Sequence, residues 1–258
     1  MSQSKTDSGT LDTRAGAETQ IETMGKADPF ADFPCRALAT DYDGTIATHG
    51  AVGDSTRAAL RRFRATGRRL ILVTGRRMAD LATVYAHFTD FDVIVAENGA
   101  VLYWPEKKEE QPLAEPPPHE FIQLLVKADV RPIERGAVIV ATFEPYDHAV
   151  LNAIKTLGLE LQVIFNKGAV MVLPTGINKA TGLKQALKAL GIAPEEVAAV
   201  GDAENDHALL DFCGLSAAVD NALPALKEHA KCVLSAGHGQ GVEELIHRIL
   251  SAAAADTK

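Results

Sequence analysis

The sequence predicts an α/β protein with a parallel-sheet core and an inserted α+β domain. From Arg36 onward, short apolar runs alternate with amphipathic segments, which is the pattern of a parallel sheet covered by helices. Residues 105–173 interrupt this alternation with a different order of elements. The chain has 258 residues, of which 47% are hydrophobic and 23% charged, so its composition is that of a globular protein with one or two domains.

The predicted core strands are short runs of apolar residues. They are residues 37–40, 70–74, 93–96 and 197–200 and, more weakly, 217–219 and 232–234. The first four runs are continuous rather than alternating, which indicates strands that are buried on both faces. A last helix over residues 242–255 completes the alternation.

The helices between these strands have recognisable ends. Asp54 or Ser55 is a suitable N-cap for a segment that ends at Gly67. Residues 179–190 form a second amphipathic segment, and Gly191 follows it as a C-terminal stop.

The insertion is expected to be a small α+β domain. It opens with two stretches, residues 107–110 and 116–118, that are typical of an exposed linker. Its predicted helices are residues 119–128 and 147–157, and its predicted strands are residues 137–142, 161–165 and 169–173. The expected domains are therefore a discontinuous core, residues 35–104 and 174–258, and an inserted cap, residues 105–173.

Composition also narrows the partners and the compartment. Residues 1–34 have few apolar side chains and are expected to be a disordered tail. The formal charge of −8 disfavours nucleic acid, and no apolar run suggests a membrane span or a secretory signal, so we expect a cytoplasmic protein. The three cysteines lack metal or disulfide spacing and are expected to be small buried residues. Monomer and homodimer remain open.

Two acidic segments directly follow predicted strands. The first is Asp41-Tyr42-Asp43-Gly44-Thr45, and the second is Gly201-Asp202-Ala203-Glu204-Asn205-Asp206. In an open α/β sheet, ligands bind beyond the carboxyl ends of the strands, which is where both segments lie. Asp41 and Asp43 can serve one site only if the chain turns there, and Gly44 permits such a turn.

Carboxylates that converge at one sheet edge repel one another, so a cation is expected among them. Oxygen ligands favour magnesium, which also keeps waters and a phosphate oxygen in its octahedral shell. An EF-hand calcium loop is excluded, because counting from Asp41 puts Ile46 and Val52 where that loop needs Gly and Glu. Counting from Asp202 gives His207 and Cys213 at the same two positions.

Thr74-Gly75-Arg76 and Lys179 add groups suited to a phosphate. The threonine hydroxyl and the backbone amides of a strand-to-helix turn can hold phosphoryl oxygens. The lysine ammonium supplies compact positive charge where negative charge develops.

In this order the motifs resemble the four motifs of the haloacid dehalogenase-like phosphohydrolases, over residues 37 to about 250. The insertion between the second and third motifs, preceded by Glu97-Asn98-Gly99, is similar to the Cof-like branch with its α+β (type IIB) cap. Within that branch, the short insertion resembles archaeal-type phosphoglycolate phosphatases and sucrose-phosphate phosphatases.

The resemblance implies a Rossmann-like core, a mobile cap and a two-step transfer from a small phosphomonoester, of the phosphoglycolate or sugar phosphate class. Asp41 becomes the nucleophile that carries the phosphoryl group, and Asp43 the general acid and base. The implied metal site holds Mg²⁺ through Asp41, the Asp43 backbone carbonyl and Asp202, with Asp206 as a further ligand or an outer-shell support. The phosphate is held by Thr74, Gly75 and Lys179. Arg76, Asn98 and Asn205 are candidates for contact with the substrate, and a structural role remains open for Arg76 and Asn98.

Three alternatives remain at this stage. A phosphomutase of the same superfamily returns the phosphoryl group to a sugar. A signalling receiver also combines acidic residues with Thr and Lys, although it lacks the second acid and the cap. A catalytically silent binding module is the third. Outside the motifs, the side chains with weaker claims to a role are His49, His238, Arg131, Arg135, Lys155 and Lys167.

Overall fold

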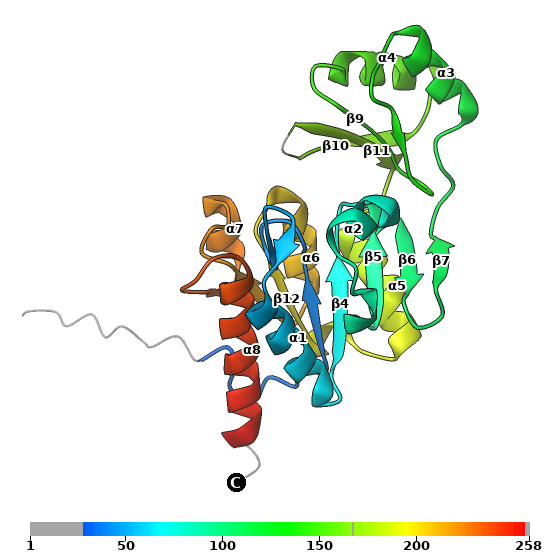
Figure 1. Cartoon of the computed structure of the whole chain (residues 1–258). Coiled ribbons are helices and arrows are strands. Elements are labelled where there is room, and N and C mark those ends of the chain that lie inside the picture. Colours follow the sequence, from blue (N-terminus) through cyan, green and yellow to red (C-terminus); the bar gives the residue numbers. More distant parts are fainter. Residues whose placement is uncertain (1–27, 167, 256–258) are drawn as a thin grey trace, which may run out of the picture.

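The structure of the protein, a computed structural model, describes residues 28–166 and 168–255. It consists of a core built on one large sheet and a smaller cap built on a second sheet (Figure 1). The chain enters the cap after strand β7 and returns to the core after strand β11 (Figure 1). The predicted fold class, a parallel-sheet core with an inserted α+β cap, is confirmed.

The core sheet has eight strands in the order β14-β13-β12-β1-β4-β5-β6-β7. The first six in this order are parallel, and β6 and β7 extend the sheet as antiparallel strands. Their bounds are β1 Ala37–Thr40, β4 Arg69–Val73, β5 Val93–Ala96, β6 Val101–Trp104, β7 Glu109–Pro112, β12 Val197–Gly201, β13 Leu215–Ala218 and β14 Cys232–Val233.

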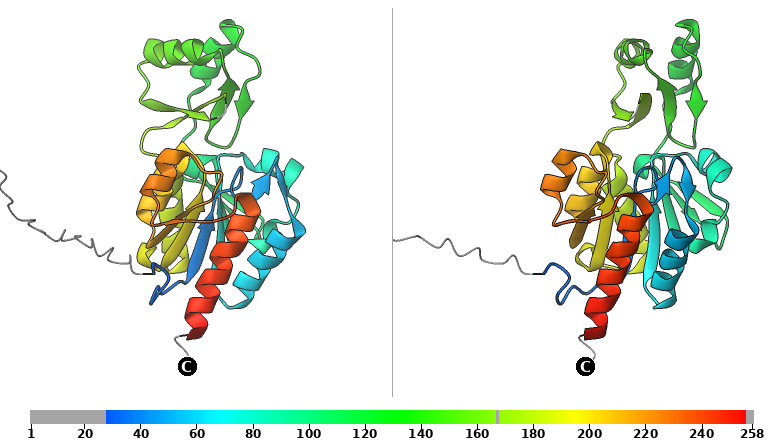
Figure 2. Two further views of the ribbon diagram at one scale, coloured as in Figure 1. Left: turned by 90° about the vertical axis from the view of Figure 1, so that its left-hand side faces the viewer. Right: turned by 60° about the vertical axis from the view of Figure 1, so that its left-hand side comes forward.

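Helices cover both faces of this sheet, which is why its central strands are apolar throughout. Every residue of β1, between β12 and β4, is fully buried. On one face α1 packs against α8 (Figure 2). On the other face α5 packs with α6 and against β5 (Figure 2). The core helices are α1 Asp54–Ala65, α2 Met78–Val84, α5 Lys179–Leu190, α6 His207–Phe212, α7 Pro224–His229 and α8 His238–Ala255.

The cap sheet is antiparallel, in the order β10-β11-β9-β8. Its elements are α3 His119–Lys127, β8 Glu134–Arg135, β9 Val140–Phe143, α4 Asp147–Leu157, β10 Leu161–Asn166 and β11 Ala169–Pro174. Side chains alternate between its two faces, as the pleat requires. Val140, Val170 and Val172 belong to the cluster formed with α3 and α4, whereas Met171 packs with the core.

Three features differ from the sequence predictions. Residues 107–110, predicted as linker, are joined to the core sheet by β7, which pairs with β6. A small hairpin of β2 (Ala47–Thr48) and β3 (Ala51–Val52) follows the first acidic turn. The last helix begins at His238 instead of residue 242.

Most of the predicted N-terminal tail, residues 1–27, lies outside the described residues. For the described part of that tail the prediction is wrong. Phe30 is only 3% exposed and belongs to the main hydrophobic cluster. The guanidinium of Arg248, in α8, lies 4.1 Å from the centre of the Phe30 ring. An aromatic side chain stacked by arginine holds this segment on the core.

Two smaller predictions can be compared directly with the structure. Cys35, Cys213 and Cys232 are buried free thiols, as expected. In the described part of the chain, no helix combines the length and apolar character needed to cross a membrane.

Candidate active site

The first acidic turn begins where β1 leaves the core sheet. The Asp41 N–H still donates to the Val200 carbonyl of β12, at 3.0 Å, so the backbone of this residue is held by the sheet. The chain then turns, and Gly44 adopts a φ of +91°. The Asp41 side chain is 4% exposed. The nucleophile predicted from sequence therefore sits on a rigid strand end.

The two acidic turns meet, as the sequence predicts. A Cβ on Gly44 would lie 2.1 Å from Oδ2 of Asp202, so the second turn approaches where only glycine leaves room. The hydroxyl of Thr45 lies 3.0 Å from Asp202 Oδ1 and 3.3 Å from Asp41 Oδ2. The Thr45 hydroxyl therefore shares its proton between Asp41 and Asp202, one carboxylate from each acidic turn, although the two residues are 161 positions apart in the sequence.

Lys179 supplies the buried positive charge. It is the first residue of α5, whose start is fixed by a capping box between Asn178 and Thr181. The Lys179 ammonium donates to Asp41 Oδ1 and to Asp206 Oδ1, both at 2.6 Å, and the side chain is 2% exposed. One lysine thus links carboxylates from both acidic turns.

Asp206 also organises its own turn. Its Oδ2 accepts the N–H groups of Asp202, at 2.9 Å, and Ala203, at 3.1 Å. With Oδ1 on Lys179, the carboxylate is held from both sides. Asp206 therefore fixes the backbone that carries Asp202.

Burial changes the protonation of this cluster. Burial raises the pKa of Asp41 to about 8, because desolvation and the carboxylates of Asp206 and Asp202 outweigh the Lys179 ammonium. For Lys179 the opposite balance holds: burial lowers its pKa, but the facing carboxylates of Asp206 and Asp41 raise it by more. The lysine is a permanent cation, and Asp41 needs further positive charge to ionise fully near neutral pH.

The three buried carboxylates fit a divalent metal ion. One oxygen from each of Asp41, Asp202 and Asp206 lies within 4.8 Å of the others. When all three are ionised they carry three negative charges against the single charge of Lys179. A compact, oxygen-only donor set of this kind suits Mg²⁺, which uses few carboxylates and completes its shell with water or phosphate oxygens.

Asp43 does not join that carboxylate cluster. Its two oxygens accept the Nε and Nη2 groups of Arg76, at 2.6 and 2.7 Å. Arg76 also lies over the ring of Tyr42, with 5.5 Å between the guanidinium carbon and the ring centre. The Asp43 carboxylate therefore faces the cavity from the arginine side, while Asp41 faces the lysine.

The remaining predicted residues come together around these groups. The Thr74 hydroxyl is fully buried and accepts the Arg76 N–H at 3.1 Å. Asn205, from the second acidic turn, donates through Nδ2 to Oδ1 of Asn98 at 3.0 Å. Gly75 lies beside the Asn98 side chain, where an added Cβ would be 3.2 Å from its oxygen. The Asn98 N–H also donates to the Thr74 carbonyl, so the buried Thr74 and Asn98 and the half-buried Asn205 form one polar connection between three strand ends.

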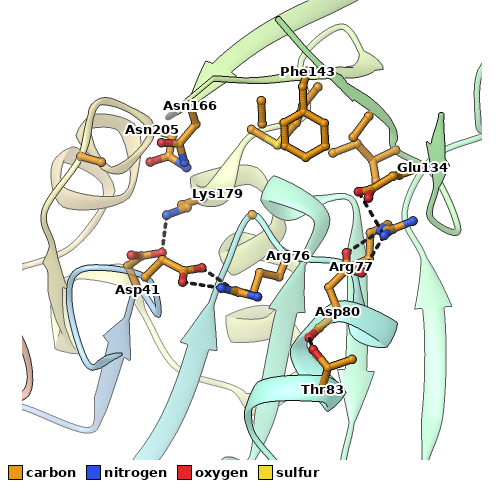
Figure 3. A pocket seen from close by; sticks show the side chains of 17 residues that line it. Asp41, Arg76, Arg77, Asp80, Thr83, Glu134, Phe143, Asn166, Lys179 and Asn205 are labelled. Carbon is orange, nitrogen blue, oxygen red and sulfur yellow. Dashed lines mark hydrogen bonds and ion pairs between the residues drawn. The ribbon is translucent and has the colours of Figure 1, made fainter. Parts of the chain in front are cut away.

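A cavity of about 450 Å³ separates these core residues from the cap. The core contributes charged and amide groups to its lining, among them Asp43 and the labelled residues Asp41, Arg76, Lys179 and Asn205 of Figure 3. The cap contributes a largely apolar wall, made of Ile139, Ala141, Phe143, Ala169 and Met171, with Glu134 and Asn166 at its edges. The volume suits a small molecule.

Several residues with weaker sequence claims lie away from this cavity. Arg131 is exposed and paired with Asp129. The side chains of Arg135, Lys155 and His49 are exposed, and none of the three lines the cavity. Lys167 lies outside the described residues.

Sequence reasoning missed the groups that hold the first acidic turn from the far side. The Gly44 carbonyl accepts the Asn221 amide at 2.8 Å, and Nδ1 of His238 lies 3.0 Å from the same oxygen. His238 is thus a support of the turn, a role that its glycine-rich surroundings do not reveal. Asn221 could have been found, because it is a polar residue just beyond a predicted strand.

The fold and this cluster define a class: Rossmann-like enzymes that carry their reactive groups on turns at the carboxyl ends of parallel strands. The chain belongs, within that class, to the haloacid dehalogenase-like hydrolase family, whose model matches residues 38–134 and 137–246. This match confirms the resemblance found in the motifs and an enzyme of the hydrolase class.

Similar proteins and similar solved structures are consistent with membership of this hydrolase family. The chain is 31% identical over 223 residues to a phosphoglycolate phosphatase from Methanothermobacter thermautotrophicus, covering 83% of this chain and 99% of the relative. A haloacid dehalogenase-like hydrolase from Bacteroides thetaiotaomicron has a similar fold, with a TM-score of 0.70, 20% identity and coverage of 83% and 99%. A subclass IIB sugar phosphatase of the same superfamily gives a TM-score of 0.67 at 18% identity, with coverage of 82% and 98%.

Proposed function

We propose that this enzyme is a magnesium-dependent phosphatase that hydrolyses a small phosphomonoester through an aspartyl phosphate on Asp41. The observation that carries the proposal is the position of Asp41: it is buried, bonded to Lys179, close to two further carboxylates, and part of the lining of the cavity. A carboxylate nucleophile needs cations around it to approach a phosphate dianion.

In the first step, an oxygen of Asp41 forms a bond to phosphorus while the bond from phosphorus to the leaving oxygen breaks. Asp43 gives the leaving oxygen its proton. In the second step, Asp43 takes a proton from water as the water oxygen attacks phosphorus, which releases phosphate and restores Asp41. The ion pair with Arg76 keeps Asp43 at the edge of the cavity between these steps.

Lys179 orients Asp41 through its 2.6 Å hydrogen bond and places positive charge beside the transferring group. The backbone of Gly75 and the hydroxyl of Thr74 are proposed to hold phosphoryl oxygens, and Asn98 and Asn205 to contact the substrate. Mg²⁺ would be held by Asp41, Asp202, Asp206 and the Asp43 carbonyl, and it would supply charge that neutralises the carboxylates and the phosphate.

The substrate class follows from the cavity and from the relatives together. A volume of about 450 Å³ limits the leaving group to a small metabolite. The relative named above is a phosphoglycolate phosphatase, and a neighbour in fold is a sugar phosphatase. We therefore propose phosphoglycolate or a sugar phosphate as the substrate.

The test is phosphate release from a panel that includes phosphoglycolate, hexose phosphates and p-nitrophenyl phosphate. Activity with Mg²⁺ that disappears on complete chelation supports the proposal, and activity that survives chelation contradicts the metal assignment. Release of phosphate without added sugar bisphosphate separates hydrolysis from the phosphomutase alternative. The receiver and silent-module alternatives are disfavoured because the family match extends over both halves of the core and the cap.

A further inference from the structure

One loop of the cap is buried against the core. Residues 136–139 connect β8 to β9, and the Gly136 N–H donates to the Ile139 carbonyl at 2.8 Å, which closes the turn. Val138 and Ile139 are 0% and 1% exposed, and both belong to the main hydrophobic cluster of the core, not to the separate cluster of the cap. The tip of the cap hairpin therefore lies inside the core's apolar surface.

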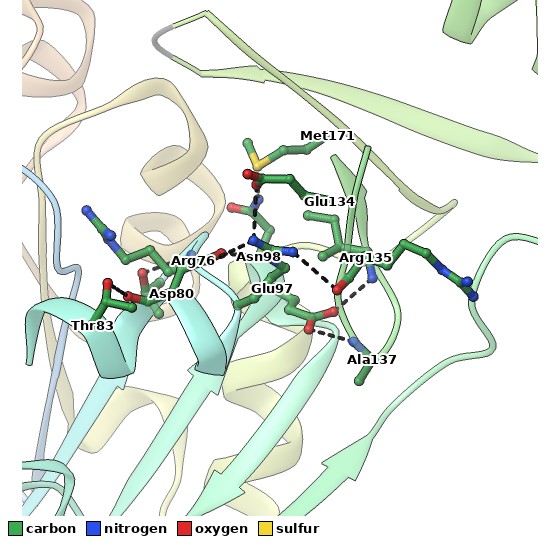
Figure 4. A network of polar contacts seen from close by, with 12 residues as sticks. Arg76, Asp80, Thr83, Glu97, Asn98, Glu134, Arg135, Ala137 and Met171 are labelled. Carbon is green, nitrogen blue, oxygen red and sulfur yellow. Dashed lines mark hydrogen bonds and ion pairs between the residues drawn. The ribbon is translucent and has the colours of Figure 1, made fainter. Parts of the chain in front are cut away.

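Burying such a tip removes its backbone amides from water, so they need acceptors. The carboxylate of Glu97, a core residue that is 2% exposed, accepts the N–H groups of three consecutive hairpin residues. Its Oε1 accepts the Ala137 N–H at 2.8 Å (Figure 4). Its Oε2 accepts the N–H groups of Val138 and Ile139 at 2.9 and 2.8 Å. Consecutive amides directed at one anion form a charge-assisted contact between the two domains.

Both partners are shaped for this contact. Glu97 and Asn98 each have a backbone φ of +53°, which residues other than glycine rarely adopt. On the cap side, a Cβ on Gly136 would lie 2.2 Å from Glu97 Oε1, so only glycine admits the carboxylate. A strained turn on one side and an obligatory glycine on the other indicate a built interaction.

The turn formed by Glu97 and Asn98 also contacts residues of the candidate active site. The Asn98 N–H donates to the Thr74 carbonyl at 3.0 Å, and its side chain accepts from Asn205. Its Nδ2 donates to Sδ of Met171, on cap strand β11, at 3.3 Å. Glu97 and Asn98 therefore connect two strand ends of the core to the β8–β9 loop and to strand β11 of the cap.

We propose that Glu97 is a positioning residue that fixes the β8–β9 hairpin, and with it the apolar wall of Ile139, Ala141 and Phe143, opposite Asp41. Glu97 does not line the cavity, so it acts through the hairpin backbone. The inference rests on the proposed phosphatase function. Loosening this contact changes how the leaving group is held, while Asp41 and its partners keep their geometry.

The first experiment measures the contact without using activity. In Glu97→Gln, one oxygen is replaced by an NH₂ group that faces N–H donors, so the hairpin amides lose acceptors. Hydrogen–deuterium exchange of residues 137–139 is expected to become about 10- to 100-fold faster, with the core strands unchanged. Glu160→Gln, at an exposed position of the cap, is the matched control and leaves exchange as in the wild type.

The second experiment uses p-nitrophenyl phosphate with Mg²⁺. In Glu97→Gln the KM is expected to rise about 10-fold, while kcat stays within about threefold, because the cap wall and not the reacting groups has moved. Gly136→Ala, which displaces the carboxylate from the cap side, is expected to give the same split. This second variant leaves Glu97 intact, so it keeps the test valid if the first variant folds poorly.

The outcomes separate the two proposals. Unchanged exchange at residues 137–139 in both variants overturns the contact. Faster exchange with an unchanged KM overturns the positioning role. A fall in kcat as large as the rise in KM also overturns it. Wild-type protein that releases no phosphate from any substrate of the panel overturns the proposed function, whereas the exchange result still tests the contact by itself.

Discussion

The core and the cap face the same cavity with opposite chemistry. The core side is a closed polar network, in which the buried Lys179 donates to the buried carboxylates of Asp41 and Asp206. The cap side is a largely apolar strand face whose Phe143 is 41% exposed, and Glu134 and the β8–β9 loop make polar contacts with Arg77 and Glu97 of the core. In the proposed function, this contrast assigns the bond chemistry to the fixed charges of the core and the contact with the leaving group to the largely apolar face of the cap.

The largest effect that tests this division is expected from Asp41→Asn. The substitution removes the proposed nucleophile but preserves the shape of the side chain, so kcat should fall by at least about 10⁴-fold while the fold stays intact. The measurement is phosphate release, with circular dichroism to monitor folding. Asp129→Asn, an exposed position of the cap, is the matched control and should retain full activity. An Asp41→Asn variant within tenfold of the wild type would contradict the role of the core network.

Lys179→Met is expected to cost stability as well as activity. It leaves Asp41 and Asp206 buried without their cation, and breaking a buried ion pair by removing one partner costs about 3–5 kcal/mol. Urea unfolding at pH 8 in the presence of chelator should show this loss. Lys184→Met, exposed on the same helix, should change the free energy of unfolding little. Equal stability of the two variants would show that the lysine is not needed by the carboxylates.

The stabilisation by Mg²⁺ should grow with pH. Burial raises the pKa of Asp41 from 3.8 to about 8, so the metal-free folded protein binds a proton there that the unfolded chain has already lost. Its stability must therefore fall as pH rises between these two values, by at most about 1.4 kcal/mol per pH unit. Lys179, with a pKa raised above its ordinary value, stays charged throughout this window.

A metal ion that takes the place of this proton removes the loss. The Tm difference between protein in Mg²⁺ and protein in chelator should therefore increase between about pH 5 and pH 8. Asp41→Asn should flatten this dependence. A shift in Tm that is the same across the range would exclude Asp41 as the linked group.

The core site was predictable because its chemistry is local. Asp41 and Asp202 follow apolar strands directly, and in a parallel sheet the carboxyl ends of neighbouring strands meet at one edge. The helix that starts at Lys179 was also predictable, because its apolar residues recur at helical spacing and Gly191 ends it. Sequence spacing therefore suffices to bring these groups together before any side-chain conformation is known.

Other features depend on contacts that sequence spacing does not encode. The residues of β7, Glu109–Pro112, have no apolar pattern, and the strand exists only because the edge of β6 offers backbone partners. The pairing of Asp43 with Arg76 is a choice of side-chain conformation. The amides that Glu97 accepts belong to a loop whose position follows from packing between the domains.

The smallest expected effect comes from the rim of the cavity, where Arg77 of the core lies 3.1 Å from Glu134 of the cap. The two side chains are 18% and 35% exposed, and Arg77 also pairs with Asp80, so the contact should contribute less than about 1 kcal/mol. Glu134→Gln should change the KM for p-nitrophenyl phosphate by about threefold or less at low salt.

That small change should vanish at about 1 M salt, where charges are screened within about 3 Å. The effect of Glu97→Gln should persist there, because its carboxylate is buried and bonded to backbone amides. Measuring both variants at the two salt concentrations distinguishes a buried contact from an exposed one between the same two domains. If Glu134→Gln proves to be the salt-resistant variant, the cap is held on the core mainly by its rim, and the hairpin is secondary.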